Sequence, residues 1–244
     1  HSFPTHTHRF DSFVIYREFI GRNGKIVVKL QRALYGLKEA SKLWYLELSN
    51  TLVKLCKLQK SQIDECVFYN AVCICTLHVD DLLISSTTRE EIERIKSILI
   101  RKYDSITIKE DEVIKYLGMK VNVQDKNMMR ITMKESIEKV LNEFNITTTS
   151  KVPADENLFE HDETGLLTRE QQAVLRSGVA KLLFIASRVR PEVLLPINYL
   201  CGRADKYTER DFQIFLKILK YLKKNPEKGL VFKKENEVVV NVYA

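Results

Sequence analysis

The sequence is poor in cysteine and has no pattern that would build a disulfide framework or a zinc site. Its five cysteines, among 244 residues, are an odd number and include neither a CxxC pair nor a Cys/His pairing at zinc spacing. Small extracellular domains held by disulfides have denser, paired cysteines. We therefore expect reduced thiols in an intracellular protein, with Cys73 and Cys75 as small buried hydrophobes on one face of a strand.

Hydrophobic runs long enough to cross a membrane are absent as well. A span requires about 20 apolar residues, whereas the richest stretch, 71–84, is interrupted by His78, Asp80 and Asp81. The first residues, HSFPTHTHRF, contain no initiator methionine and no basic start or apolar core of a signal peptide. We expect no membrane contact, and we interpret the chain as the interior of a longer polypeptide.

The composition that is present belongs to a globular protein. Hydrophobic residues make up 45% and charged residues 29% of the chain, which excludes a disordered tail. Basic residues outnumber acidic ones by 39 to 32, which permits a polyanionic partner such as nucleic acid without demonstrating one. No internal repeat or heptad array is present, and the mixture of strand-like and helix-like patterns predicts an α+β fold.

The most informative segment is the apolar run VCICTLHV, which ends at Asp80-Asp81 and is followed at once by LLIS. Two apolar runs around a polar pair predict a β-hairpin with the acids at its tip. Carboxylates mounted on rigid strands can hold two Mg²⁺ ions about 4 Å apart, the separation used in phosphoryl transfer. Taken alone, however, an Asp-Asp pair is more often a solvated turn.

The other elements are predicted from periodicity and turn signals. Capping-box spacing at Thr88/Glu91 and at Thr132/Glu135 marks the starts of two helices, and a polar turn at 124–127 marks a second hairpin. Periodicity is lost from 145 to 168, which we interpret as a linker and a domain boundary. The remaining predicted elements are strands at 25–30, 66–69 and 237–243 and helices at 40–55, 169–187 and 208–224.

Three motifs occur in order along the chain, namely LQRALYGLKEASKLWY at 30–45, HVDD at 78–81 and KYLGMKV at 115–121. In this order they resemble the reverse transcriptases of copia-type retrotransposons. The resemblance implies a palm-like antiparallel sheet with covering helices, followed by a mostly helical thumb or connection segment. It divides the chain into a poorly matched remnant at 1–24, a partial palm at 25–132, a thumb-like helix and linker at 133–168, a helical connection at 169–236 and the start of an RNase H-like domain at 237–244.

The resemblance also implies roles for single residues. Asp80 and Asp81 match the catalytic, metal-binding pair, and Asp80 is favoured as the direct ligand. Lys109 falls near the position of a lysine that acts as general acid, although a solvated lysine explains it better. A template and nucleotide loop is implied for Tyr35, Gly36 and Lys38, and a primer grip for Leu117, Gly118 and Met119. Without the flanking motifs, Gly36 is equally well explained as a turn glycine, and 117–119 as an ordinary strand pair.

The chain departs from the family pattern in several places. A third catalytic carboxylate is implied at about the position of His1, but HSFPTHTHRF does not match the motif, and Asp11, the nearby acid, has the wrong neighbours. His78 stands where the family usually has tyrosine. The fingers are not matched, and the sequence stops at Ala244, where the first RNase H aspartate would follow. We therefore expect this chain by itself to be inactive.

In the intact family member the resemblance implies RNA-directed DNA synthesis by nucleotidyl transfer, with two Mg²⁺ or Mn²⁺ ions. The implied partners are an RNA or DNA template-primer, deoxynucleotides and the remainder of a polyprotein, located in a cytoplasmic particle or the nucleus. Two alternatives stay open. One alternative to a reverse transcriptase fragment is a non-catalytic nucleic-acid-binding remnant of a decayed retroelement. The other is a chain that no longer folds, because a palm without its first strand leaves sheet edges uncovered.

Two further features each allow two interpretations. The stretch 206–234 contains nine Lys or Arg against three acids, so it could follow phosphates, but a solvated helix face explains much of it equally well. The single tryptophan, Trp44, could serve as a platform for base stacking. Its helical spacing with Leu48 and Leu52 favours a core position instead.

Overall fold

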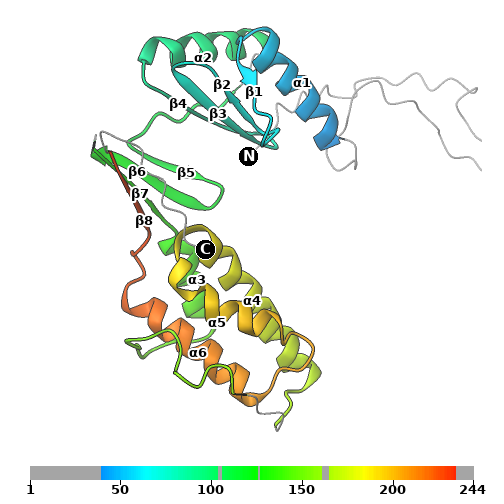
Figure 1. Ribbon diagram of the computed structural model, residues 1–244, viewed down its shortest axis with the longest axis vertical. Helices are drawn as coiled ribbons and strands as arrows, with labels where there is room; N and C mark the ends of the chain where they lie inside the picture. Colours follow the sequence, from blue (N-terminus) through cyan, green and yellow to red (C-terminus); the bar gives the residue numbers. More distant parts are fainter. Residues whose placement is uncertain (1–39, 104–105, 126, 161–164, 235–244) are drawn as a thin grey trace, which may run out of the picture. The chain divides into compact units, whose positions relative to one another are not determined.

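The computed structural model describes residues 40–103, 106–125, 127–160 and 165–234, which belong to two compact units, His1–Ile108 and Lys109–Ala244. Both units combine an antiparallel sheet with helices, so the predicted α+β class is confirmed (Figure 1). The strands predicted at 25–30 and 237–243 lie outside the described residues. No helix within the described ranges is long and apolar enough to cross a membrane.

The first unit is a four-stranded sheet with two helices on one face. Its strands follow one another in the order β1-β2-β3-β4, all antiparallel. Side chains from the helices and from the strands share one hydrophobic core. The elements are α1 (Ala40–Lys54), β1 (Gln59–Lys60), β2 (Val67–Tyr69), β3 (Cys73–His78), β4 (Asp81–Ser86) and α2 (Arg89–Tyr103).

The burial pattern of β3 shows which face of the sheet packs against the helices. Cys73, Cys75 and Leu77 are 2%, 0% and 3% exposed, whereas Ile74 between them is 55% exposed. Alternate side chains of a strand point to opposite faces, so one face of β3 enters the core beneath α1 and α2. The thiols are free and behave as the small buried hydrophobes that the sequence predicts.

The second unit begins with another antiparallel sheet, in the order β5-β6-β7-β8. Its strands are β5 (Val113–Tyr116), β6 (Met119–Asp125), β7 (Met128–Thr132) and β8 (Leu230–Lys233). The predicted hairpin around 124–127 is confirmed as β6–β7. A further hairpin, β5–β6, turns at Leu117 and Gly118, where the family resemblance implies the primer-grip hairpin. Periodicity alone did not indicate it, because the alternation of apolar residues continues through the turn.

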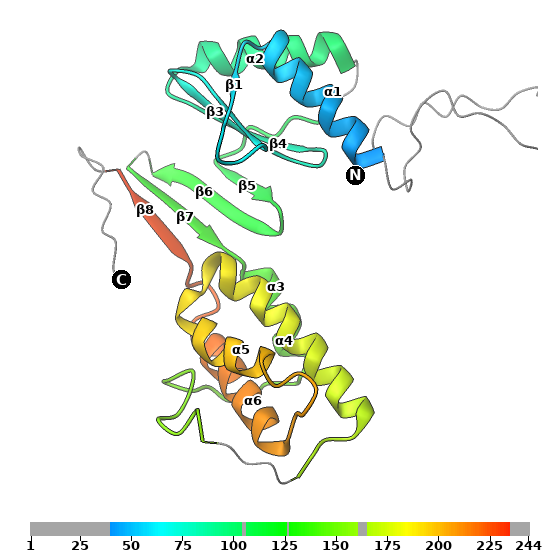
Figure 2. The same ribbon diagram turned by 45° about the vertical axis from the view of Figure 1, so that its right-hand side comes forward.

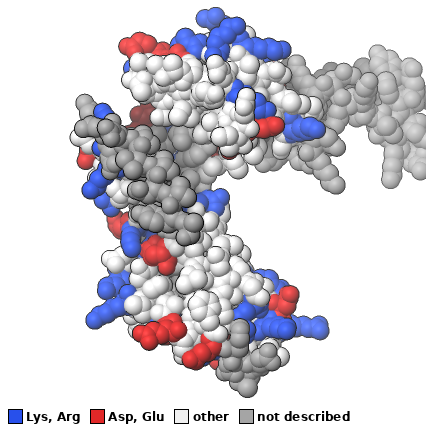
Figure 3. Space-filling view, in the orientation of Figure 1, with Lys and Arg blue, Asp and Glu red and all other residues white. Residues whose placement is uncertain are grey.

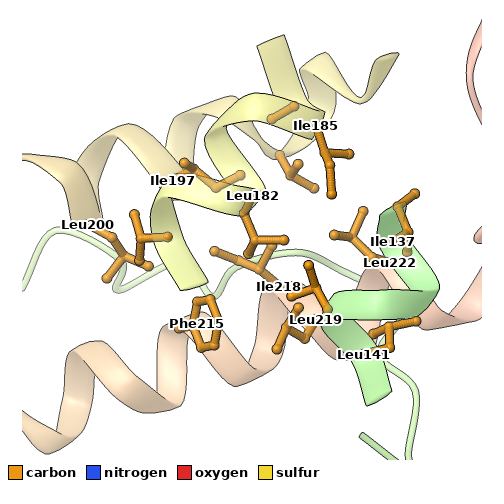
Figure 4. Close-up of a cluster of buried hydrophobic side chains, with 14 of the residues drawn as sticks. Ile137, Leu141, Leu182, Ile185, Ile197, Leu200, Phe215, Ile218, Leu219 and Leu222 are labelled. Carbon is orange, nitrogen blue, oxygen red and sulfur yellow. The ribbon is translucent and has the colours of Figure 1, made fainter. Parts of the chain in front are cut away.

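Four helices and a 3-10 turn form a bundle with a single core, shown in Figure 4. The elements are α3 (Lys134–Glu143), α4 (Arg169–Val189), η2 (Pro191–Val193), α5 (Leu194–Cys201) and α6 (Glu209–Lys224). The capping box predicted at Thr132/Glu135 is wrong. The N-cap of α3 is Met133, without a side-chain hydrogen bond, and Glu135 pairs instead with Lys115 at 2.8 Å. Helix α5 was not predicted.

The segment 145–168, which we expected to separate two domains, lies within the second unit. Its apolar residues Ile146, Leu158 and Leu167 are buried, and the Ser150 amide donates to the Lys220 carbonyl at 3.0 Å. Polar composition suggested a linker, but three buried side chains are enough to fix the segment against the helices. The boundary between the compact units falls at Ile108/Lys109 instead. The palm, thumb and connection ranges stay predictions.

We predict that Gly178→Ala destabilises the helical bundle. An added Cβ would lie 2.6 Å from Phe215 Cζ and 2.9 Å from Phe144 Cζ, and these two rings already pack edge to face at 4.7 Å. Overpacking of this kind lowers the free energy of unfolding by about 1–3 kcal/mol. Denaturant titration measures it. Gly202→Ala is the matched control, since its Cβ would meet the Tyr199 carbonyl oxygen at 3.5 Å and should be tolerated. Equal stability of the two variants contradicts the packing argument.

Candidate active site

The two acids lie at the tip of the β3–β4 hairpin, as predicted. Six residue pairs join the strands, ending with His78 opposite Asp81, so Val79 and Asp80 form a two-residue turn. Both flanking strands are anchored by the core of the first unit, in which Leu77 is buried and Leu82 partly buried. A tip held by packed strands on both sides fixes the backbone positions of the two acids.

The turn contains a backbone conformation that its sequence does not favour. Val79 has a φ of 54°, in the left-handed region, whereas Asp80 is not among the residues with positive φ. A positive φ at the first central residue alone is the type II′ pattern, which normally places glycine there. A β-branched residue in this region is an outlier that costs about 1–2 kcal/mol. Strain of this kind is concentrated at functional sites.

Register determines which face of the sheet carries Asp81. Leu77 points into the core beneath α1 and α2, so its neighbour His78 points to the opposite face. Residues directly opposite one another in an antiparallel pair share a face, which places Asp81 with His78. The same face carries the exposed Ile74 and Ser85. Asp81 therefore belongs to the sheet face opposite the two helices.

Asp80 and Asp81 are both exposed, and neither forms an ion pair with a described residue. Across the described part of the chain, no three His, Cys, Asp or Glu side chains are grouped closely enough to hold a metal ion. In those ranges β4 pairs only with β3, so the far side of β4 is a sheet edge. The site as described thus offers two carboxylates, which are hard oxygen donors suited to Mg²⁺ or Mn²⁺.

The residues predicted to form a primer grip make up the turn of the β5–β6 hairpin in the second unit. Leu117 and Gly118 have φ values of 49° and 79°, the type I′ pattern, and Met119 begins β6. A Cβ on Gly118 would lie 3.8 Å from both Met133 Cε and Phe184 Cε1. The turn therefore lies close to an aromatic ring of α4.

Phe184 and Arg188 are residues near this turn that the sequence did not single out. The Arg188 guanidinium lies 3.7 Å from the centre of the Phe184 ring, which is one helical turn earlier, and Phe184 is 43% exposed. Aromatic and cationic residues four positions apart on an exposed helix face were the available signal. That signal does not reveal the contact with a turn more than sixty residues away.

Of the other residues singled out from the sequence, the structure describes Lys109 and Trp44. Lys109 is exposed in a coil at the start of the second unit. Tyr35, Gly36 and Lys38 lie outside the described residues. Trp44 packs against the core of the first unit, with its ring 5.3 Å from that of Tyr103, which confirms the core interpretation.

We predict that Val79→Gly leaves the first unit as stable as before or stabilises it by up to about 1 kcal/mol. Removing the left-handed strain offsets the extra freedom that glycine gains in the unfolded chain, about 0.5–1 kcal/mol. Val72→Gly is the control, because Val72 has a similar exposure but no positive φ. It should lower the free energy of unfolding. Thermal and denaturant melts compare the variants, and an equal loss in both would show that the Val79 conformation is unstrained.

Comparison with known proteins identifies a family. The sequence profile described as "Reverse transcriptase (RNA-dependent DNA polymerase)" matches residues 17–155, which include the Asp80–Asp81 hairpin and the β5–β6 turn. No solved structure matches significantly.

Curated relatives extend the similarity over most of the chain. The Ty1-MR1 and Ty1-BL Gag-Pol polyproteins of Saccharomyces cerevisiae are 24% identical over 237 residues, and the Ty1-GR3 polyprotein is 25% identical over 236 residues. Each alignment covers 90% of this chain but 13% of the relative, so the chain spans about one eighth of these polyproteins. The chain therefore belongs to the reverse transcriptase (RNA-dependent DNA polymerase) family, as a copia-type retrotransposon member.

Proposed function

We propose that the β3–β4 hairpin of this chain is the catalytic element of an RNA-directed DNA polymerase. The observation that carries the proposal is an exposed acid pair, Asp80 and Asp81, at the strained tip of a hairpin whose strands are anchored in a core. This hairpin lies inside the range matched by the reverse transcriptase family. The left-handed conformation of Val79 distinguishes it from an ordinary solvated turn.

Reverse transcriptases use divalent metal ions, and the donors at this hairpin fit such ions because carboxylate oxygens are hard ligands. We propose Mg²⁺ or Mn²⁺, with two ions in the complete site. When bound, the ions lower the pKa of the primer 3′-hydroxyl and stabilise the charge that develops on the transferred phosphate. Asp80, in the turn, would be a direct ligand, and Asp81 would add a second carboxylate from the first position of β4. The described residues do not contribute a third.

The other predicted residues take roles in holding substrates. We propose that the primer contacts the β5–β6 turn at Leu117, Gly118 and Met119, and that the nucleotide loop contains Tyr35, Gly36 and Lys38. Lys109 is the candidate general acid for the leaving pyrophosphate. The partners would be an RNA or DNA template-primer, deoxynucleotides and the rest of the polyprotein, including fingers and RNase H.

A second candidate function is nucleic-acid binding without catalysis. Two observations favour it. Within the described ranges the hairpin tip carries two carboxylates without a third ligand, and the chain has a net charge of +7. Two-metal chemistry with a carboxylate missing loses most of its rate, because the ions lack a bridging ligand. On this basis we propose that extension requires the rest of the polyprotein, whereas ion binding at the hairpin does not.

We predict that Asp80→Asn weakens Mn²⁺ binding to the full chain at least tenfold in isothermal titration calorimetry. Replacing one of two charged donors by an amide removes a charge-assisted ligand while preserving shape. Asp111→Asn is the control, since Asp111 is an exposed acid outside the hairpin and should leave the affinity unchanged.

A primer-extension assay on the complete polyprotein then separates the two functions. Template-dependent extension that disappears in Asp80→Asn supports the polymerase. Salt-sensitive nucleic-acid binding, with no extension and no difference in Mn²⁺ affinity between the Asp80 and Asp111 variants, would leave only the binding function.

A further inference from the structure

An aromatic ring of the helical bundle reaches the β5–β6 turn, which is made by Leu117 and Gly118. A Cβ added to Gly118 would lie 3.8 Å from Phe184 Cε1 and 3.9 Å from its Cζ, so the edge of the ring faces the turn. The same Cβ would lie 3.8 Å from Cε of Met133, the N-cap of α3. Both ribbon views show α4 passing beside the start of α3 (Figure 1 and Figure 2). The turn, α3 and α4 therefore meet at the Phe184 ring.

The core of the bundle fixes the α4 backbone on both sides of Phe184. Leu182 and Ile185 are 1% and 2% exposed, and Figure 4 shows both among the buried apolar side chains between the helices. Phe184 itself is 43% exposed. Because its neighbours along α4 fill the core, Phe184 lies at the rim of the bundle, on a backbone that has little freedom to move.

Arg188 holds the ring from another side. Its guanidinium carbon lies 3.7 Å from the centre of the Phe184 ring, which is the distance of a stacked cation–π contact. Arg188 Nη1 also donates to the Phe184 carbonyl oxygen at 3.2 Å, so the guanidinium is tied back to the helix. A cation on the face of the ring and a turn at its edge together restrict the rotamers that Phe184 can adopt.

The turn depends on contacts from outside its own hairpin. Within the described ranges β5 pairs only with β6, so the hairpin has an open edge. Leu117 has a φ of 49°, and an apolar residue in this left-handed region is strained. Figure 3 shows acidic and basic side chains interspersed over the visible surface of the second unit, so charge alone does not mark a site on that face. The contact with Phe184 is thus the feature that distinguishes this turn.

We propose that Phe184 is a positioning residue, whose ring, held by Arg188, supports the Leu117–Gly118 turn and so fixes where that turn places the primer 3′ end. This inference rests on the proposed polymerase function, in which the primer contacts the turn. Phe184 acts through the turn and does not touch the reacting atoms. Misplacing reacting atoms by about 1 Å can lower a rate about a hundredfold, so a small shift of the turn is enough to slow the reaction.

The first measurement tests the contact alone, by NMR of the isotopically labelled full chain. One Hα of Gly118 points to where the added Cβ would lie, so the ring current of Phe184 shifts its signal. We expect Phe184→Ala to remove this shift and Phe184→Tyr to retain it. Phe159→Ala is the matched control, since Phe159 is 58% exposed in the same unit but packs on Tyr199. A Gly118 signal that stays in place in Phe184→Ala would overturn the proposal.

The second measurement is primer extension by the complete polyprotein. We expect Phe184→Ala to lower kcat about tenfold and to leave the KM for the deoxynucleotide within about twofold, while Phe184→Tyr and Phe159→Ala keep wild-type values. A merely structural role would lower kcat only in proportion to the folded fraction, which circular dichroism measures. A loss no larger than that, or equal losses in Phe184→Ala and Phe159→Ala, would overturn the proposal. If the proposed function fails instead, the wild-type protein extends no primer, while Asp80→Asn still shows the Gly118 ring-current shift.

Discussion

The burial of Cys73, Cys75 and Leu77 beneath α1 and α2 fixes the geometry of the candidate site. A strand that slipped by one residue would exchange its two faces, so this packing also sets the register with which His78 meets Asp81. Full burial of a side chain such as Leu77 is worth about 1.5–3 kcal/mol, and several such residues act together. The strain at Val79, about 1–2 kcal/mol, is smaller and can be sustained. A stable core thus supports an unfavourable turn that presents two carboxylates.

Much of the first unit could be predicted from sequence, because its signals are local. The apolar run VCICTLHV, followed by Asp80-Asp81 and a second apolar run, predicted the hairpin and its tip. The sequence did not predict the strained conformation of Val79, because two apolar runs can be joined by several turn types. The sheet face that carries Asp81 could be assigned only once the face covered by the helices was known.

The second unit was harder to predict because its elements depend on distant partners. Strand β8 pairs with β7 across about one hundred residues, and a Cβ on Gly229 would lie 2.0 Å from the Ile131 carbonyl oxygen. The sequence shows a glycine but not the backbone that approaches it. The hairpin turn at Leu117 and Gly118 was indicated by the family resemblance but has no local turn signal, because an apolar residue occupies a left-handed position usually taken by asparagine or aspartate. Likewise, the polar segment 145–168 contains too few apolar residues to reveal its hydrogen bonds to Arg210 and Lys220 of α6.

The proposed chemistry requires that divalent ions bind at the tip of the β3–β4 hairpin. The most direct measurement is paramagnetic broadening of backbone amide signals by Mn²⁺ in the ¹⁵N-labelled full chain. If the ions bind there, the amides of Val79, Asp80, Asp81 and Leu82 broaden first, at the lowest Mn²⁺ concentrations. Broadening confined to other exposed acids, with this hairpin unaffected, would contradict it.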